Sequence, residues 1–487
     1  MGGAGAFLEP LAVIVLLFGG AWINRAPDSF SFSRGPLTFS SEEDDDTDVP
    51  DLPLARAVDA DADADVENQH ISRSKRSLSP SLLPSQEDKW RERELKIPVW
   101  GYRRVIQTPN TAVFRHRLLS RILHKFPFLV EAWYWALIYW VYQLGRAFTA
   151  VTLVEGTVHV ARRHALQVIE LEQHLHIFWE VPIQKFFMSY PRLMMGINWL
   201  YSFIHIPGTI AFLVWLFYYT ITKNRQIQRR AAAQSGEKAS DVGPAGSPSG
   251  PWLYEARRRT MAVCNLLAFV VFTLWPCMPP RLLSDPEYNG PQAEIAQSFG
   301  FVDTVHGKEG ASSVWTQNRF CNQYVLSWTA AMPSLHFGYS LLIGVTIMTI
   351  PLAPQHSQPS KIVHLPFFNN SHPDLAPHIR LPSTRRMLCL ALGFLYPFSI
   401  LTAIVATANH FILDAVAGSV VCFLGWKFND VLLNLLVVED YFLWCLRIHK
   451  PVQVPLQAER QAKPAGSGLK EKEGWEPEKR TVVVNAA

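Results

Sequence analysis

The chain has 487 residues, of which 49% are apolar and 12% are aromatic, but only 18% are charged. Soluble domains usually contain about a quarter charged residues, so this composition disfavours a plain soluble enzyme. The net charge is only +4, and the six cysteines show neither disulfide-framework spacing nor a CxxC pair. No nucleic-acid partner, disulfide scaffold or zinc site is therefore expected.

The first 125 residues open with an apolar stretch at 7–23 and then turn polar, with an acidic run at 42–46. The stretch lacks a basic flank before it and carries Glu9 there, which favours an uncleaved membrane anchor over a signal peptide. The polar remainder of residues 1–125 cannot bury a core, and we predict that it is mostly disordered.

Residues 126–430 contain six apolar segments that approach the roughly 20 residues a helix needs to cross a bilayer. They predict an all-α, polytopic membrane protein with a six-helix transmembrane bundle, in addition to the N-terminal apolar segment. A cytosolic tail is expected at 431–487. The predicted helices run over residues 128–149, 194–219, 261–276, 336–352, 387–408 and 411–426.

Between the first two predicted helices, residues 166–178 place apolar side chains at helical spacing, interrupted by charged ones. An amphipathic helix at the membrane interface fits this pattern, and so does a helix packed on the protein surface. Both interpretations stay open on the sequence alone.

The distribution of Lys and Arg predicts the orientation of the bundle. Residues 103–125, before the first helix, and 223–259, between the second and third, are rich in both residue types. Short basic loops stay on the cytosolic side of a membrane. The connection between helices three and four, and the one after helix five, should therefore face the lumen or the cell exterior.

Three short motifs meet on that non-cytosolic face. They are Pro279-Pro280-Arg281 after helix three, Pro333-Ser334-Leu335-His336 at the start of helix four, and the segment from His410 to Asp414 after helix five. Ionisable groups at the margin of a membrane bundle are expensive unless they have partners, so these residues are candidates for a functional site.

The residue types suit phosphoryl transfer through a phosphohistidine. Asp414 follows His410 by four residues, which would place both on one helical face, and a carboxylate that holds one imidazole nitrogen leaves the other as a nucleophile. His336 could protonate the departing oxygen as a general acid. The planar guanidinium group of Arg281 could bind two phosphate oxygens at once. Ser334 lies at a helix start, so its hydroxyl and the backbone N–H groups there could donate hydrogen bonds to the same anion.

Each piece also has an ordinary structural explanation. With 16 histidines, a carboxylate four positions after a histidine should occur about once by chance, and His176 with Glu180 has the same spacing. Arg281 could anchor its helix at the headgroups, and the prolines could simply end helices. The catalytic interpretation is favoured because the charge pattern, which does not involve these motifs, brings all three to one face.

The three motifs, the second extended to Ala331-Met332-Pro333-Ser334-Leu335-His336, resemble the signature motifs of the type 2 phosphatidic acid phosphatase (PAP2) superfamily over about residues 130–430. The Pro-Ser-Leu-His form is most similar to the fungal inositol phosphorylceramide synthase branch, the Aur1/Ipt1-type inositolphosphotransferases. The resemblance implies that His410 is the nucleophile, Asp414 its orienting group, His336 the acid, and Arg281 and Ser334 phosphate ligands. It also implies that no metal or other cofactor is needed.

The chain departs from the broader superfamily pattern at three positions. Leu274 and Ile404 stand where that pattern has a Lys and an Arg, and Leu335 stands where it has a Gly. Two missing cations leave less positive charge for a dianionic phosphate monoester, whereas a phosphodiester carries a single negative charge. The departures therefore favour a diester substrate, although Lys308 or Arg319 could substitute for the missing cations.

The leading hypothesis is a lipid phosphotransferase that moves a headgroup from a phospholipid, such as phosphatidylinositol, to a lipid hydroxyl, such as that of ceramide. The alternatives are a lipid phosphate phosphatase, in which water is the acceptor, and a non-catalytic scaffold or transporter with the same fold. We expect a multi-pass protein of an endomembrane, the Golgi or the endoplasmic reticulum, with the site facing the lumen and with membrane lipids as its partners.

Overall fold

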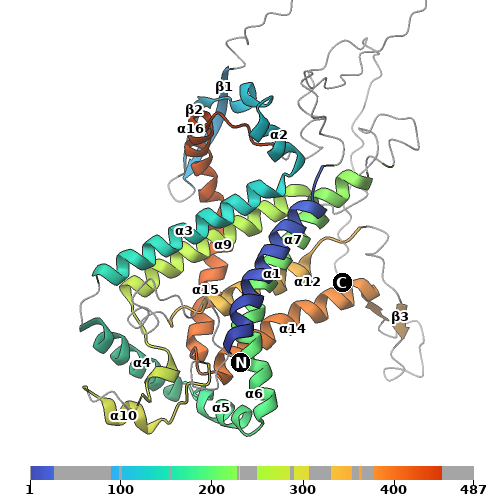
Figure 1. Ribbon diagram of the computed structural model, residues 1–487. Helices are drawn as coiled ribbons and strands as arrows, with labels where there is room; N and C mark the ends of the chain where they lie inside the picture. Colours follow the sequence, from blue (N-terminus) through green and yellow to red (C-terminus); the bar gives the residue numbers. More distant parts are fainter. Residues whose placement is uncertain are drawn as a thin grey trace, which may run out of the picture.

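A computed structural model describes residues 2–26, 89–97, 101–152, 156–227, 230, 249–285, 290–305, 331–353, 361–364 and 378–451. Helices dominate these ranges, and two antiparallel hairpins lie outside the helical bundle (Figure 1). The long helices of the bundle are α1 (Gly2–Ile23), α3 (Phe128–Thr152), α7 (His205–Phe217), α9 (Gly250–Leu274), α12 (Leu335–Thr349), α14 (Thr384–Ala406) and α15 (Ile412–Phe428).

Helices occupy all six segments where the sequence predicts them. The second predicted helix is a continuous run in which α6 (Pro191–Trp199) joins α7 through a π-helical turn, η4 (Leu200–Ile204). Among the described residues, three helices are long and apolar enough to cross a membrane, namely His205–Ile227, Thr384–Ala406 and Ile412–Leu446, while Pro10–Ile23 and Leu335–Thr349 are shorter apolar helices. These helices support a membrane protein, and six crossings stay a prediction.

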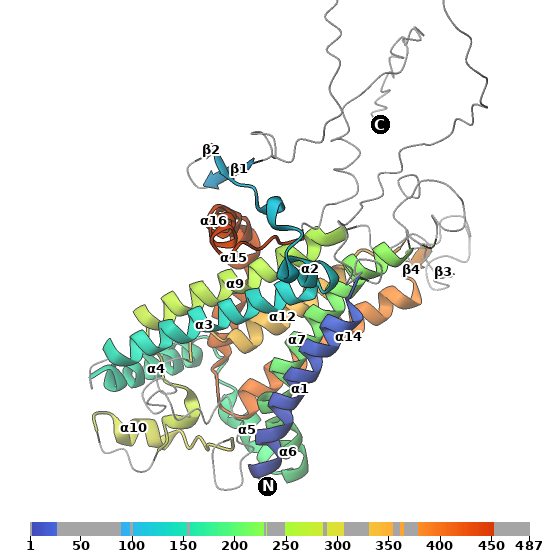
Figure 2. The same cartoon turned by 45° about the horizontal axis from the view of Figure 1, so that its top comes forward.

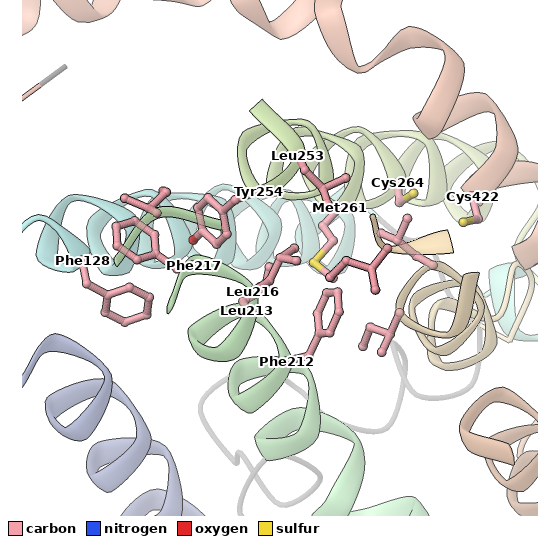
Figure 3. Close-up of a cluster of buried hydrophobic side chains, with 14 of the residues drawn as sticks. Phe128, Phe212, Leu213, Leu216, Phe217, Leu253, Tyr254, Met261, Cys264 and Cys422 are labelled. Atoms are coloured by element: carbon pink, nitrogen blue, oxygen red, sulfur yellow. The ribbon is translucent and has the colours of Figure 1, made fainter. Parts of the chain in front are cut away.

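The centre of the bundle is an apolar core around α7 (Figure 3). Phe217 of α7 makes edge-to-face contacts with Phe128 of α3 and Tyr254 of α9, with ring centroids 5.3 and 5.1 Å apart. Edge-to-face aromatic pairs contribute about 0.5–1.5 kcal/mol beyond the burial of their area. This core fixes α7 and α9, whose ends carry residues of the candidate site.

Glycines allow α12 to approach its two neighbours closely. A Cβ atom on Gly344 of α12 would lie 2.3 Å from the carbonyl oxygen of Gly393 in α14, and one on Gly418 of α15 would lie 2.3 Å from that of Ser334. Small residues at such crossings let helix backbones pack in membrane proteins. The start of α12 is thereby held against α15, close to the third motif.

The bundle has two different ends (Figures 1 and 2). One, named here the hairpin end, carries the hairpin β1 (Trp90–Ile97) and β2 (Tyr102–Pro109), α2 (Leu118–Lys125), and α16 (Leu436–Leu446), which continues from α15 through η8 (Asn429–Leu435). The other, the site end, carries α4 (Gly156–His174), α5 (Glu180–Met188), α6 and α10 (Ala293–Ser298). A second hairpin pairs β3 (Lys361–His364) with β4 (His378–Leu381).

The hairpin end contains ordered elements on both sides of the predicted membrane domain. Part of the polar region predicted to be disordered is ordered at 89–97 and 101–125, because Arg93 and Thr108 of the hairpin bind Asp440 of α16. The hairpin is thus stabilised by a distant helix and needs no core of its own. The boundary predicted at residue 430 falls inside a helical run that extends to Leu446.

The first part of the segment predicted at 166–178 lies in α4, which starts at Gly156 and ends at His174, and residues 175–178 follow this helix. One face of α4 is buried, including Ala161, Ala165 and Ile169, whereas Leu171 of the same helix is exposed. The buried face packs on the segment that follows α9, since Met278 donates its backbone N–H to the carbonyl of Ala161 at 3.1 Å. Helix α4 is therefore packed against the rest of the site end through its buried face.

Candidate active site

Backbone hydrogen bonds join the three motifs although they lie far apart in the sequence. Each bond joins two segments that lie at the end of α9 or α14 or at the start of α12 or α15. The bonds run from Ala331 N–H to Cys277 O (3.0 Å), from Arg281 N–H to Ala408 O (2.9 Å) and from Ser334 N–H to Asp414 O (3.0 Å). The motifs therefore form one structural unit at the site end.

His410 lies in the turn between α14 and α15. Its Nδ1 is 2.8 Å from the carbonyl oxygen of Ala331 and 3.4 Å from Oδ2 of Asp414. A carbonyl can only accept a hydrogen bond, so Nδ1 carries the proton and Nε2 keeps the lone pair. The ring is thus in the tautomer that a nucleophilic Nε2 requires.

The helical argument for His410 and Asp414 is wrong in one respect. His410 precedes α15, which starts at Ile412, and the chain before it turns through Ala408 with a φ of 51°. The two side chains approach each other through this turn, not by stacking along one helical face. Asp414 accepts the N–H of Phe411 at 2.9 Å, so the main partner of the imidazole is the carbonyl of Ala331.

His336, the second residue of α12, faces His410 with ring centroids 5.5 Å apart. Tyr201 and His205 pack on the same imidazole, each with its ring centroid 4.8 Å from that of His336. The structure therefore brings both predicted histidines into one site and adds two rings, one from η4 and one from the first residue of α7.

Neither Tyr201 nor His205 was predicted. His205 is 7% exposed, and its Nδ1 has no hydrogen-bond partner among the described residues. It follows a π-helical turn, a feature frequent at functional sites. A histidine inside an apolar run was itself a usable signal, because ionisable residues in membrane segments are functional candidates by default.

Arg281 forms an ion pair with Asp303, with Nη1 and Oδ2 2.7 Å apart. The backbone N–H of Val305 donates to the other oxygen of Asp303 at 3.1 Å, and Gln184 binds both backbone polar groups of Val302. The phenol of Tyr201 lies within electrostatic reach of both Arg281 and Asp303. The predicted phosphate-binding cation is thus next to the histidines and faces a carboxylate.

Ser334 is fully buried and caps α12, since its Oγ accepts the N–H of Phe337 at 3.4 Å. Its own N–H is bound to the carbonyl of Asp414, so that donor is already used inside the protein. The hydroxyl proton is the donor of Ser334 that remains for a phosphate oxygen. Its role as a phosphate ligand stays a prediction.

The two positions that lack the cations of the broader pattern differ in their surroundings. Leu274, the last residue of α9, is 77% exposed, while Ile404 of α14 is fully buried in an apolar cluster with Val405 and Ala415. Neither side chain contributes charge to the site. Lys308 and Arg319, the suggested substitutes, lie outside the described residues.

Two glutamates that were not predicted reach the start of α15. Glu172 of α4 accepts the N–H of Leu413 at 2.8 Å, and Glu180 of α5 accepts the N–H of Ile412 at 2.9 Å. Both side chains are 0% exposed. In the sequence, Glu180 stood out only as a chance neighbour of His176, which lies exposed in the turn between α4 and α5.

The fold and the site define a helical membrane protein with two opposed histidines, an acidic residue beside one of them and an arginine nearby. A family model described as PAP2 superfamily matches residues 166–233, 249–356 and 379–428. These ranges include Arg281, Ser334, His336, His410 and Asp414, and the match supports membership in that superfamily. No curated protein and no solved structure matches the chain.

Members of the PAP2 superfamily are phosphatases or phosphotransferases, and the match supports an enzyme of this kind. The three membrane-length helices in the described part of the chain agree with activity on lipids, which are the substrates that the superfamily suggests.

Proposed function

We propose that the protein is a lipid phosphotransferase of the inositol phosphorylceramide synthase type. In the first half-reaction, Nε2 of His410 attacks the phosphorus of a phospholipid diester. A P–N bond forms, the P–O bond to diacylglycerol breaks, and protonated His336 gives its proton to the departing oxygen.

The second half-reaction reverses these roles. His336, now neutral, takes the proton of a lipid hydroxyl such as that of ceramide, whose oxygen attacks the phosphorus. The new P–O bond forms as the P–N bond breaks, and the lone pair returns to Nε2 of His410. The observation that carries the proposal is the pairing of these rings, 5.5 Å apart, with Nδ1 of His410 held by Ala331.

The charges around Arg281 support a diester donor. Arg281 already faces Asp303, and positions 274 and 404 carry no cation. A dianionic monoester would bring two negative charges beside this carboxylate, whereas a diester brings one. The electrostatic cost therefore favours the diester, and the same charges favour transfer over monoester hydrolysis.

The second candidate is a lipid phosphate phosphatase, because the superfamily includes phosphatases and both reactions pass through one phosphohistidine. They differ in whether the acceptor pocket excludes water. Purified protein should be incubated with headgroup-labelled phosphatidylinositol, with and without ceramide. Label transfer that depends on ceramide supports the transferase, and acceptor-independent phosphate release from phosphatidic acid would overturn it.

We also propose that the site faces the lumen of the Golgi or the endoplasmic reticulum. The basic flank at 103–125 lies with the hairpin end of the bundle, opposite the end that carries the site (Figure 2). Basic flanks stay cytosolic, so the opposite end would open to the lumen. A protease-protection assay on sealed microsomes, with a cleavage site inserted near α10, tests this orientation.

A further inference from the structure

The first turn of α15 is held by three buried carboxyl groups. A helix start leaves four backbone N–H groups without partners inside the helix, and side-chain acceptors commonly satisfy them. Here the acceptors come from three different helices. The bonds run from Phe411 N–H to Asp414 Oδ2 (2.9 Å), from Ile412 N–H to Glu180 Oε1 (2.9 Å) and from Leu413 N–H to Glu172 Oε1 (2.8 Å).

The second oxygens of these carboxyl groups have no donor. Oε2 of Glu172, Oε2 of Glu180 and Oδ1 of Asp414 are buried and lack a hydrogen-bond partner among the described residues. No ion pair joins a Lys or Arg of the described residues to Glu172 or Glu180. A buried carboxylate without a cation or a full set of donors is strongly destabilising.

A proton between the two glutamates removes this difficulty. The carboxyl groups of Glu172 and Glu180 interact with each other, and both also feel the charge of Asp414. Burial, reinforced by the charge of Glu180, raises the pKa of Glu172 to about 9, and burial also raises the pKa of Glu180. Two carboxyl groups that share a site cannot both ionise easily, so one of them keeps its proton at neutral pH.

We infer that Glu172 and Glu180 form a proton-sharing carboxyl pair that fixes the first turn of α15 and so acts as a positioning device for His410. The inference rests on the proposed function only in taking His410 as the nucleophile. His410 is two residues before Ile412, and Asp414 lies within the clamped turn, so a loosened turn displaces both.

The pair also makes the geometry sensitive to pH. With one shared proton, Glu172, Glu180 and Asp414 carry two negative charges, and three once that proton leaves. The titratable groups that face the pair are Asp414 from α15 and the thiol of Cys277 from the segment after α9, with His410 beside Asp414. None of them supplies a fixed positive charge, so repulsion rises when the proton is lost.

The sign of the effect follows from the pKa. An unperturbed glutamate has a pKa of about 4.3, and in the folded protein burial and Glu180 raise that of Glu172 to about 9. Stabilisation by the protonated pair is therefore complete at low pH, weakens as the unfolded chain ionises, and is lost as the pH passes about 9. The contacts that hold the first turn of α15 to α4 and α5 should therefore weaken as the pH approaches and passes about 9.

The test compares E172Q with E172L in the full-length protein in detergent. Gln keeps the acceptor for Leu413 and donates to Glu180, so it imitates the protonated pair at every pH. Leu removes both interactions. Glu170, exposed on the same helix, provides the matched control E170L. Hydrogen–deuterium exchange of peptides over residues 408–420 reports the first turn of α15 without relying on any reaction.

After correction for the intrinsic exchange rate, we expect hydrogen exchange over residues 408–420 of wild type to accelerate above pH 9. Exchange in E172Q should stay slow across this range, and exchange in E172L should already be fast at pH 7. With the donor lipid, E172L should lose about 10²-fold in kcat with little change in KM, because misplacement of a reacting group by about 1 Å costs that much. E172Q and E170L should stay near wild type.

Slow exchange in E172L, or the same pH response in E172Q and wild type, would overturn the inference. Should E172L fail to fold, the pH response of E172Q still decides the question. Failure of the proposed transferase reaction would leave the exchange data unchanged, so the two proposals fail separately.

Discussion

The hairpin end and the site end lie at opposite ends of the bundle (Figures 1 and 2), and their ionisable side chains are arranged differently. At the hairpin end, charges meet in pairs of opposite sign, such as Arg93 with Asp440 at 2.7 Å and Arg258 with Glu131 at 2.7 Å. At the site end, groups of the same type gather, in addition to the ion pair between Arg281 and Asp303. Three imidazoles and three carboxyl groups lie there, namely His205, His336, His410, Glu172, Glu180 and Asp414.

This difference indicates that the hairpin end stabilises the fold and that the site end carries the reaction. In an ion pair, charges of opposite sign neutralise each other, and the pair between Arg93 and Asp440 holds the hairpin on α16. Gathered imidazoles and carboxyl groups are costly to bury, and such clusters occur where proton transfer or nucleophilic attack is needed. Substitutions at the site end should therefore change turnover, and substitutions at the hairpin end should change stability alone.

His410→Ala should have the largest effect. The variant has no nucleophile for the phosphohistidine, so we expect headgroup release to fall by about 10⁴-fold or more, with normal expression and Tm. The measurement is release of labelled headgroup from phosphatidylinositol by purified protein. His176→Asn is the matched control, because His176 also has a carboxylate four residues later but lies exposed outside the site. Normal turnover in His410→Ala would remove the catalytic assignment.

The sequence could supply the elements and the motif histidines, but not their neighbours. Apolar runs of membrane length predict helices directly, so all six segments were found. Glu172 and Glu180 were not identified, because a carboxylate in an amphipathic segment looks the same whether it meets solvent or a helix start. The hairpin was missed for a related reason, since its charged strands depend on Asp440, 347 residues after Arg93.

The spacing of residues in the sequence could not predict which groups the site residues contact. The interval from His410 to Asp414 matches a helical repeat, yet the helix starts between them and the imidazole binds a backbone carbonyl. Arg281 was identified by type, but its pairing with Asp303 depends on how the loop at 299–305 folds back on α5 and α6. Such contacts depend on the packing of elements and leave no local pattern.

His336→Ala should rank second. Loss of a general acid costs about 10²- to 10⁴-fold when the leaving group needs a proton. A p-nitrophenyl diester with the same headgroup has a leaving group that needs none, so its cleavage should fall far less. Equal losses for both substrates would assign His336 to binding or packing instead of proton transfer.

Asp303→Asn should have a smaller effect, on selectivity. Asn keeps the acceptor for Val305 but removes the charge beside Arg281, so phosphatidic acid should bind about tenfold better while the diester changes little. Competition assays with both lipids measure this ratio. Glu294→Gln, an exposed carboxylate on α10, is the control. An unchanged ratio would show that Asp303 does not oppose the dianion.

Arg93→Ala at the hairpin end should have the smallest effect on turnover and act on stability. Among the described residues, it leaves the Thr108 hydroxyl at 2.8 Å as the side-chain hydrogen-bond donor to the buried Asp440, which costs about 1–3 kcal/mol and lowers Tm by a few degrees. Removing the stranded charge in Arg93→Ala/Asp440→Asn should restore part of the loss. Lys96→Ala, which breaks an exposed pair with Glu94, should leave Tm unchanged. The hairpin end contains no group of the proposed reaction, so kcat should stay within about twofold of wild type in all three variants. A large fall in kcat at normal Tm would show that residues of the hairpin end also contribute to the reaction.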